Sequence, residues 1–160
     1  MSWETARDHL AKWGKEKDVI EPGVSTATVA LAAAAIGVEP ARIAKTLAVY
    51  RGKSALLVVA AGTARLDNRK FKEQFAFKPR MLSGEDTFRI TSHQPGGVCP
   101  FGIPEEVEVF LDASLKVFES VFPACGTATT SIELTLAELK EISGSKGWVD
   151  VCKMPEEASG

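Results

Sequence analysis

Two apolar runs separated by four residues constrain the fold of this chain more than any other feature. The runs "TLAVY" (46–50) and "ALLVVAA" (55–61) are rich in strand-forming residues, and the "RGKS" between them contains a glycine, as tight hairpin turns often do. They predict two neighbouring antiparallel strands. Because the second run contains no polar residue, we expect it to be buried on both faces.

Helical patterns precede this hairpin. Apolar residues recur every three or four positions over 3–13, which predicts an amphipathic helix that docks onto the core. An alanine-rich helix is expected to begin at a cap formed by Ser25 and Thr26 and to end at Gly37. A short helix over 40–44 then leads into the first strand of the hairpin.

The remaining elements favour an α+β fold, because strands and helices do not alternate regularly. We expect a single domain over 1–160 with a mixed, mostly antiparallel sheet flanked by helices. Further helices are predicted at 68–75 and 84–90 and after the capping-box residues Thr135 and Glu138, and further strands at 79–82, 107–112, 120–124, 131–136 and 148–151.

Composition narrows the class of protein. Apolar residues make up 45% of the chain, yet no run approaches the roughly 18 uncharged apolar residues of a membrane span. The N-terminus lacks the basic-then-apolar order of a signal peptide, so we expect a cytoplasmic protein with no membrane partner. The net charge of −2 argues against broad binding to a DNA duplex, whereas a few local cations are enough to hold one nucleic-acid end.

Cysteine usage predicts neither a disulfide framework nor a zinc site. The three cysteines are odd in number, widely separated and without a C-x-x-C pair, and the chain has only two histidines.

The stretch "PGGVCPFGIP" (95–104) is the most unusual loop in the sequence. It lacks the GK[ST] ending of a phosphate loop and the G-x-G-x-x-G spacing of a dinucleotide-binding turn. Its glycines give the backbone freedom and its prolines stiffen it, so its N–H groups could face an anion or a developing oxyanion. The alternative is a tight connection between a helix and a strand.

Cys99 and His93 suggest a second kind of site, a thiol nucleophile with a base. No third residue stands out to orient the histidine, and a free cysteine beside Pro100 and Phe101 also fits a small buried apolar residue. Both interpretations remain open on the sequence.

Lys45 is a cation within the apolar passage "ARIAKTLAV", at the junction between the short helix and the first strand. Burying an ammonium is costly unless an anion meets it, so Lys45 could bind a phosphate or a carbonyl oxygen. The alternative is a lysine whose stem covers apolar surface while the ammonium reaches water. Arg42 could add a second positive charge, and Asp112 is typical of a turn or helix cap.

Three separated passages together resemble a known family. They are "STATVALAAAAIGVEPARIAKTLAV" (25–49), "GGVCPFGIPEEVEVFLDASL" (96–115) and "ACGTATTSIELTLAEL" (124–139). In order and spacing they resemble the YbaK/ProX (YbaK/EbsC) aminoacyl-tRNA editing domains, relatives of the insertion domain of bacterial prolyl-tRNA synthetase. The resemblance covers about 22–151, which we take as the core of the domain.

This resemblance implies a freestanding deacylase that hydrolyses the ester between a mischarged amino acid and the 3′ end of its tRNA, without a metal or other cofactor. It assigns the family's functional lysine to Lys45 and the loop around the aminoacyl group to 96–100. Ser131 departs from an aspartate that some members carry in "DIEL", which leaves the amino acid open.

The expected site residues fall into two groups. The catalytic group is Lys45, Gly96, Gly97, Val98 and Cys99, and the substrate-binding group is Thr26, Thr46, His93, Pro100, Phe101 and Ser131. The expected partner is the aminoacylated 3′ end of tRNA, with a synthetase as a further one. The alternative function is a non-catalytic module that binds tRNA ends or another ligand in association with a synthetase.

Overall fold

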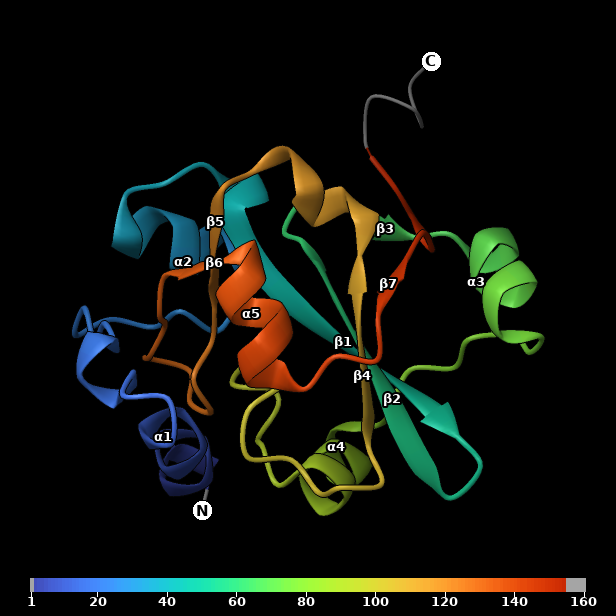
Figure 1. Ribbon diagram of the computed structural model, residues 1–160, viewed down its shortest axis with the longest axis horizontal. Coiled ribbons are helices and arrows are strands. Elements are labelled where there is room, and N and C mark those ends of the chain that lie inside the picture. The colour runs from blue at the N-terminus through green and yellow to red at the C-terminus, as the bar shows by residue number, and fades with distance from the viewer. Residues whose placement is uncertain (1, 155–160) are drawn as a thin grey trace.

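The predicted hairpin forms the centre of the fold. The computed structural model, which describes residues 2–154, pairs β1 (Ile43–Arg51) with β2 (Ser54–Ala61) in antiparallel register from Ala44 opposite Ala61 to Arg51 opposite Ser54 (Figure 1). Gly52 turns the chain with a φ of +62°. Every residue of β2 after Ser54 is buried, as the unbroken apolar run predicts.

The main sheet is mixed, which confirms the α+β prediction. Its strand order is β6-β5-β1-β2-β4-β7; β1–β2 and β5–β6 are antiparallel, and β1–β5, β2–β4 and β4–β7 are parallel. A separate two-stranded sheet pairs β3 with β8. The outer strands are β3 (Arg65–Leu66), β4 (Glu108–Asp112), β5 (Ser120–Pro123), β6 (Leu134–Thr135), β7 (Trp148–Val149) and β8 (Cys152–Lys153).

Five α-helices surround the sheet in the described residues. In Figure 1, α2 lies on the side of β5 and β6, α3 lies on the opposite side, and α5 lies in front of the sheet. The helices are α1 (Ser2–Ala11), α2 (Val29–Ile36), α3 (Asn68–Phe75), α4 (Gly84–Thr91) and α5 (Leu136–Ser143), with 3₁₀ turns η1 (Glu16–Asp18), η2 (Pro40–Arg42) and η3 (Ala113–Val117).

Several helix ends follow the predicted caps. The Asp67 side chain accepts hydrogen bonds from two backbone N–H groups of α3, and the Ser83 hydroxyl accepts one from Asp86 N. Thr135 and Glu138 form the reciprocal capping box of α5. Asp112 caps η3 by accepting from Ser114 N at 2.9 Å. These ends form as predicted because the cap and its partners lie within a few residues of each other.

The alanine-rich helix corrects one prediction. α2 begins after Thr28, whose hydroxyl accepts from Leu31 N at 3.1 Å, and not after Ser25 and Thr26. The Ser25 hydroxyl instead accepts from Ala27 N, which closes a turn before the helix. Gly37 ends α2 in the left-handed conformation, as predicted.

Several predicted strands are shorter in the structure, among them the one expected over 148–151, which is confined to β7. The run 79–82 contributes only one bridge, between Met81 and Val49, and the strand expected over 131–136 is confined to β6. Ser131 instead makes isolated bridges with Ile20 and Ala124. Residues 132 and 133 lie in no strand, so the bridges of Ser131 are separated from β6.

The N-terminal helix and α2 attach to the sheet through different parts of the core. Ala6 and Leu10 of α1 are fully buried in the main core, as the helical spacing predicts, whereas Trp13 lies past the helix end and is 43% exposed. A smaller apolar cluster joins α2 to β1 and β5 through Ala32, Ala33, Ile43 and Phe122. This second cluster fixes α2 beside the start of β1.

Gly62 allows the end of β2 to approach η2 and α2. A Cβ at this position would lie 2.7 Å from Val29 Cγ1 and closer still to the backbone oxygen of Pro40. We expect Gly62→Ala to lower the free energy of unfolding by about 1–3 kcal/mol, because backbone atoms must move to admit the methyl group. Urea denaturation measures the change.

Gly84→Ala is the matched control for Gly62→Ala. Its added Cβ would meet only Pro95 Cγ, at 3.6 Å, and Gly84 begins α4 without a positive φ. This variant should be as stable as the unmodified protein or slightly more stable. Equal stability of the two variants would contradict the close approach at Gly62.

Candidate functional site

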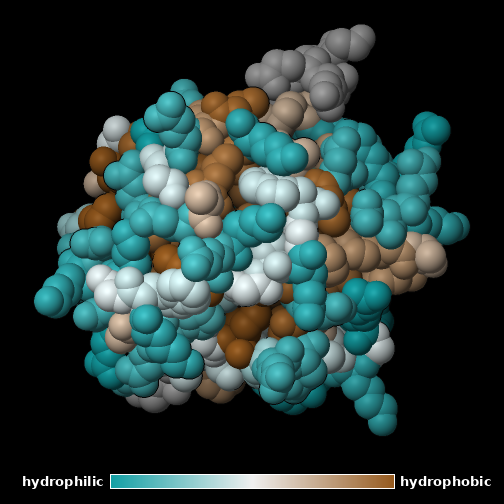
Figure 2. Space-filling model, in the orientation of Figure 1, coloured by the Kyte–Doolittle hydropathy of each residue, from teal (hydrophilic) through white to brown (hydrophobic). Residues whose placement is uncertain are grey.

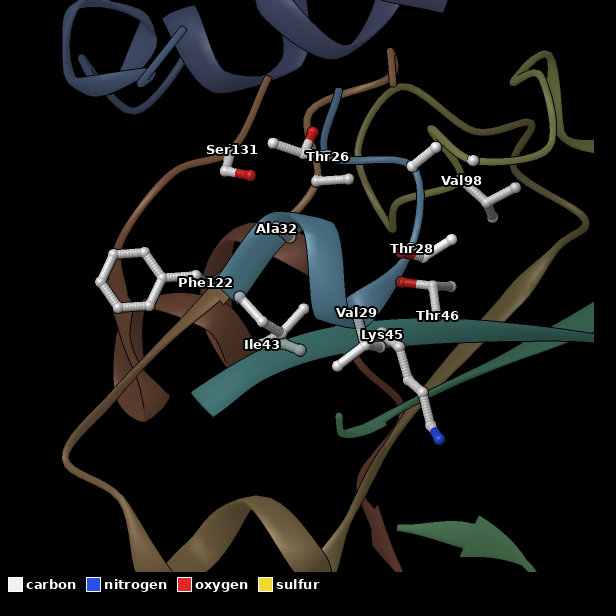
Figure 3. Close-up of a pocket in the computed structure, with 14 residues that line it drawn as sticks. Thr26, Thr28, Val29, Ala32, Ile43, Lys45, Thr46, Val98, Phe122 and Ser131 are labelled. Atoms are coloured by element: carbon white, nitrogen blue, oxygen red, sulfur yellow. The ribbon is translucent and has the colours of Figure 1, made fainter. Parts of the chain in front are cut away.

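A cavity of about 160 Å³ lies between α2, the start of β1, β5 and two loops (Figure 3). The segment before α2 contributes Thr26 and Thr28, and β1 contributes Ala44 and Thr46. Further parts of the wall come from α2, from the 96–98 loop and from residues between Phe122 and Ser131. Segments that are distant in the sequence therefore meet in one pocket.

Two hydroxyls in this pocket have no hydrogen-bond partner among the described residues. They are Thr26 Oγ1 and Thr46 Oγ1, and both atoms are buried. A buried hydroxyl left unpaired costs about 1–3 kcal/mol, so such groups usually have a reason to be present. A ligand with polar atoms would supply the missing partners.

Ser131 holds one wall of the pocket through its backbone. Its N–H donates to Ile20 O at 3.0 Å and its carbonyl accepts from Ile20 N at 2.6 Å, while the side chain faces the cavity (Figure 3). Thr26 N donates to Ala128 O at 2.5 Å, which ties the segment before α2 to the same wall. The hydroxyl positions are therefore fixed by backbone pairing.

Lys45 is the third residue of β1, two residues inside the strand and not at its junction with the preceding helix. It lines the pocket, but its side chain points away from Thr26 and Ser131 (Figure 3). The Nζ atom donates to Gly62 O at 3.2 Å and to Ala64 O. Burial lowers the pKa of the Lys45 ammonium from its ordinary value.

The Lys45 ammonium retains one donor. An ammonium has three N–H groups, and the described residues provide two acceptors for them. The third N–H is available to an anion that reaches the rim of the pocket.

The glycine-rich loop forms one wall, and its two glycines have different roles. Gly96 lines the cavity with a φ of +91° and lies against Ala27, where an added Cβ would come within 3.3 Å of Ala27 Cβ. Gly97 does not line the cavity. Its N–H donates to Gln94 O at 3.0 Å, and an added Cβ would lie 2.7 Å from Thr127 N. Gly97 therefore allows the loop to pack against the neighbouring segment.

Val98 also lines the cavity, but the residues after it turn into the core. Pro100 is buried, and Cys99, Phe101 and His93 are fully buried. His93 Nε2 lies 2.6 Å from Phe101 O and 3.4 Å from Cys99 Sγ. The structure brings these four predicted site residues together behind the loop, and none of them lines the pocket.

Burial also sets the ionisation of this cluster. It raises the pKa of the Cys99 thiol to about 12, and it lowers the pKa of the His93 imidazole. A thiol with such a pKa is almost entirely protonated at neutral pH, so it is a poor nucleophile. The arrangement favours a structural role for Cys99 and His93 over the thiol-and-base interpretation.

Sequence reasoning missed the apolar part of the pocket. Val29, Ala32, Ile43, Phe122 and Ala124 line the cavity but look like ordinary core residues in the sequence. No local signal distinguishes them, because their shared position arises only when α2 packs on β1 and β5.

Arg42 stabilises the wall beside these residues. Its guanidinium donates to Ser120 Oγ at 2.7 Å and to Glu133 Oε2 at 3.2 Å, and it lies 5.0 Å from the centre of the Phe122 ring. It is thus an ordering contact between η2, β5 and the segment before β6, and not a free second cation.

The described residues contain no group of three or more histidine, cysteine, aspartate or glutamate side chains that could hold a metal ion. Within the same range, no helix has the length and apolar character needed to cross a membrane.

The chain belongs to the aminoacyl-tRNA editing domain family, whose model matches residues 23–142. The match includes the pocket and the loop around it. Editing of aminoacyl-tRNA is therefore the function that the family supports.

The chain is also similar to two curated proteins. The chain is 51% identical over 155 residues to the uncharacterized protein YwhH of Bacillus subtilis, covering 96% of this chain and 98% of that protein. It is 27% identical over 114 residues to the proline–tRNA ligase of Bacillus licheniformis, covering 71% of this chain but 20% of the ligase.

Solved structures show the same fold. One, described as a candidate trans-editing enzyme for prolyl tRNA synthetase, has a TM-score of 0.84 at 29% identity and covers 95% of this chain and 97% of its own. A hypothetical protein, APE2540, has a TM-score of 0.79 at 27% identity and covers 91% of this chain and 99% of its own.

The burial of Cys99 leads to a chemical prediction. At pH 8 and in the folded state, iodoacetamide should label Cys99 far more slowly than it labels the same thiol in urea, because alkylation requires an accessible thiolate. Mass spectrometry of the labelled peptides reports each cysteine separately. Fast labelling of Cys99 in the folded protein would restore the thiol-nucleophile hypothesis.

Proposed function

We propose that this protein is a freestanding aminoacyl-tRNA deacylase, a single editing domain over its whole length that hydrolyses the ester of a mischarged tRNA in trans. The observation that carries the proposal is the pocket at β1, which is lined by Lys45 and by two threonines, Thr26 and Thr46, whose buried hydroxyls have no partner among the described residues. Family membership and the similarity to a candidate trans-editing enzyme support the same activity.

The reaction requires only a few polar groups. A water oxygen bonds to the ester carbonyl carbon, the bond from that carbon to the ribose oxygen breaks, and the proton displaced from water ends on the ribose oxygen. The products are a free amino acid and an uncharged tRNA. A free ribose hydroxyl of the terminal adenosine could orient the water. Because the ester is already activated, orientation and oxyanion stabilisation are the main tasks of the protein.

The loop N–H groups of Gly96 and Val98 are the proposed donors to the tetrahedral oxyanion. Both residues line the cavity, and neither N–H has a backbone acceptor among the described residues. Gly97, whose N–H is held by Gln94, supports the loop instead. Donors that are fixed before the reaction are effective because they need no reorganisation in the transition state.

Lys45 is the proposed contact to the terminal phosphate. Its ammonium points away from the pocket interior and retains one N–H without an acceptor among the described residues, which suits a phosphate outside the pocket better than the carbonyl inside it. Thr26, Thr46 and Ser131 are then left to contact the aminoacyl group. A cavity of this size is close to the roughly 150 Å³ that holds one benzene molecule, so we propose a small aminoacyl group as substrate.

Release of amino acid from charged tRNA tests the activity. A panel of alanyl-, cysteinyl-, seryl- and threonyl-tRNA, each correctly charged and mischarged, should include at least one ester that the protein hydrolyses. Lys45→Met should lower kcat/KM for that substrate by about 10- to 100-fold, because a charge-assisted contact of about 1.5–3 kcal/mol is lost.

Lys53→Met is the matched control, because Lys53 is exposed in the turn between β1 and β2. It should hydrolyse the substrate at the unmodified rate. Full activity of Lys45→Met would remove Lys45 from the site, and no release from any member of the panel would contradict the deacylase proposal.

The unpartnered hydroxyls allow a test that separates function from stability. Thr46→Val keeps the shape of the side chain and removes a hydroxyl that bonds to nothing in the described residues. We therefore expect activity to fall while the free energy of unfolding stays equal or rises by about 1 kcal/mol. Urea denaturation and deacylation rates are measured on the same sample. Thr26→Val should show the same loss of activity without a loss of stability.

A threonine with a purely structural role would give the opposite pattern. The control is Thr91→Val, because Thr91 is also a threonine with a buried side chain, but its hydroxyl donates to Thr87 O at 2.6 Å. That variant should lose stability. If Thr46→Val also loses stability and keeps full activity, its hydroxyl does not contact the substrate.

One observation favours the second candidate function, a non-catalytic module that binds tRNA ends. The Lys45 ammonium already contacts two backbone carbonyls outside the pocket interior, so it is placed to bind an anion more directly than to assist bond cleavage. Saturable binding of tRNA without release of amino acid in the panel would support this function.

A further inference from the structure

Positive charge is concentrated in one segment of a chain that is acidic in total. Residues 65–80 contain six lysines and arginines against two acidic residues, whereas the whole chain has a net charge of −2. This segment comprises β3, α3 and the turn that follows it. The pocket proposal uses none of these cations.

The concentration begins next to Lys45. The Lys45 ammonium contacts the carbonyl of Ala64, and the next residue, Arg65, is exposed on β3. Arg65 is close enough to Lys45 for its charge to disfavour protonation of the lysine and so contribute to the lowered pKa. The cations of β3 therefore adjoin the rim of the pocket.

The partner strand of β3 adds further cations. Lys153 of β8 lies directly opposite Arg65 in the antiparallel register, and Lys70 Nζ of α3 donates to Cys152 O at 2.9 Å. Side chains of directly opposite residues project from the same face of a sheet. We call the four residues Lys45, Arg65, Lys70 and Lys153 the basic strip.

α3 extends the basic strip away from the pocket. Arg69 and Lys72 are exposed on this helix, and together with Lys78 they line a shallow hollow on its outer side. Figure 2 shows hydrophilic side chains projecting from the side of the molecule where Figure 1 places α3. Because α3 has eight residues, it adds about 12 Å to the length of this surface.

Local acids neutralise only part of this surface. Asp67 is held by backbone N–H groups as the cap of α3, Glu73 pairs with Arg69, and Asp150 pairs with Lys70. Arg65, Lys72 and Lys153 have no ion-pair partner among residues 2–154. Several cations are thus left for an external anion.

We propose that the basic strip and the exposed cations of α3 bind the phosphate backbone of the tRNA acceptor stem, leading from the terminal phosphate at Lys45 toward α3. This inference rests on the proposed function, because it takes the pocket as the place of the tRNA 3′ end. The occupant follows from charge and position: the strip starts at the pocket rim, and a row of cations complements a row of phosphates. The contacts are to the backbone, so the strip does not read the tRNA sequence.

The test compares two double variants of equal charge change. Arg65→Gln/Lys153→Gln removes two cations from the basic strip, and Arg7→Gln/Lys12→Gln removes two exposed cations from α1 and the turn that ends it. Each is titrated with an uncharged full-length tRNA transcript and with a trinucleotide of its 3′ terminus, over a range of salt concentrations.

The strip variant should bind full-length tRNA on the order of tenfold more weakly at low salt, and the slope of log K against log salt should fall in magnitude by about 1.5, since each lost phosphate contact contributes about 0.7–0.9. The ratio of its affinity for full-length tRNA to its affinity for the trinucleotide should decrease. The α1 variant should match the unmodified protein in affinity and slope. Circular dichroism verifies that both variants are folded.

Failure of this inference differs from failure of the proposed function. A strip variant with the affinity and salt slope of the unmodified protein overturns the inference, even when charged tRNA is still deacylated. Equal losses in the two double variants also overturn it, because the effect would then reflect net charge alone. Absence of amino-acid release by the unmodified protein contradicts the deacylase proposal, whatever the salt slopes are.

Discussion

The antiparallel register between β1 and β2 is the constraint on which the site depends. It places Lys45 opposite Ala60 and Thr46 opposite Val59, and successive side chains of a strand point to opposite faces. Thr46 therefore faces the pocket while Lys45 reaches the far side toward Gly62 and Ala64. A slip of one residue would exchange these positions.

The close approach at Gly62 connects this register to the rest of the pocket. Gly62 N donates to Ala41 O at 3.3 Å, and its lack of a side chain lets η2 and Val29 of α2 pack against the end of β2. The same residue supplies a carbonyl to Lys45. One glycine thus lets α2 pack close to the end of β2 and also accepts a hydrogen bond from the Lys45 ammonium. The pocket is a consequence of how the hairpin end packs.

Features with local causes could be predicted from the sequence. The hairpin, the caps at Asp67 and Ser83 and the capping box of α5 depend on residues a few positions apart, and all of them form. Features with distant partners could not. Ser131 pairs through its backbone with Ile20, and nothing in the residues near Ser131 signals that partner.

The same distinction explains the candidate site. The loop, the lysine and the threonines could be named from the motif, and Lys45, Thr26, Thr46, Gly96, Val98 and Ser131 do meet at one cavity. The direction of Lys45 could not be predicted, because it depends on carbonyls from another segment, and the sequence left the buried and the reactive interpretations of Cys99 open. Cysteine and histidine are potentially reactive residue types, but a reactive side chain must be exposed. Cys99 and His93 are fully buried.

The two faces of β1 carry groups that suit different parts of an editing reaction. On one face, fixed dipoles and unpaired hydroxyls in a small cavity can discriminate an aminoacyl group, since such contacts gain strength where water is excluded. On the other, exposed cations can hold phosphates in water, where each contact is weak and the sum depends on salt. Screening confines the attraction to about 8 Å around the cations at physiological salt. A tRNA held along the basic strip would then present its 3′ end to the pocket in one orientation, so charge placement would orient the substrate while the pocket selects the ester.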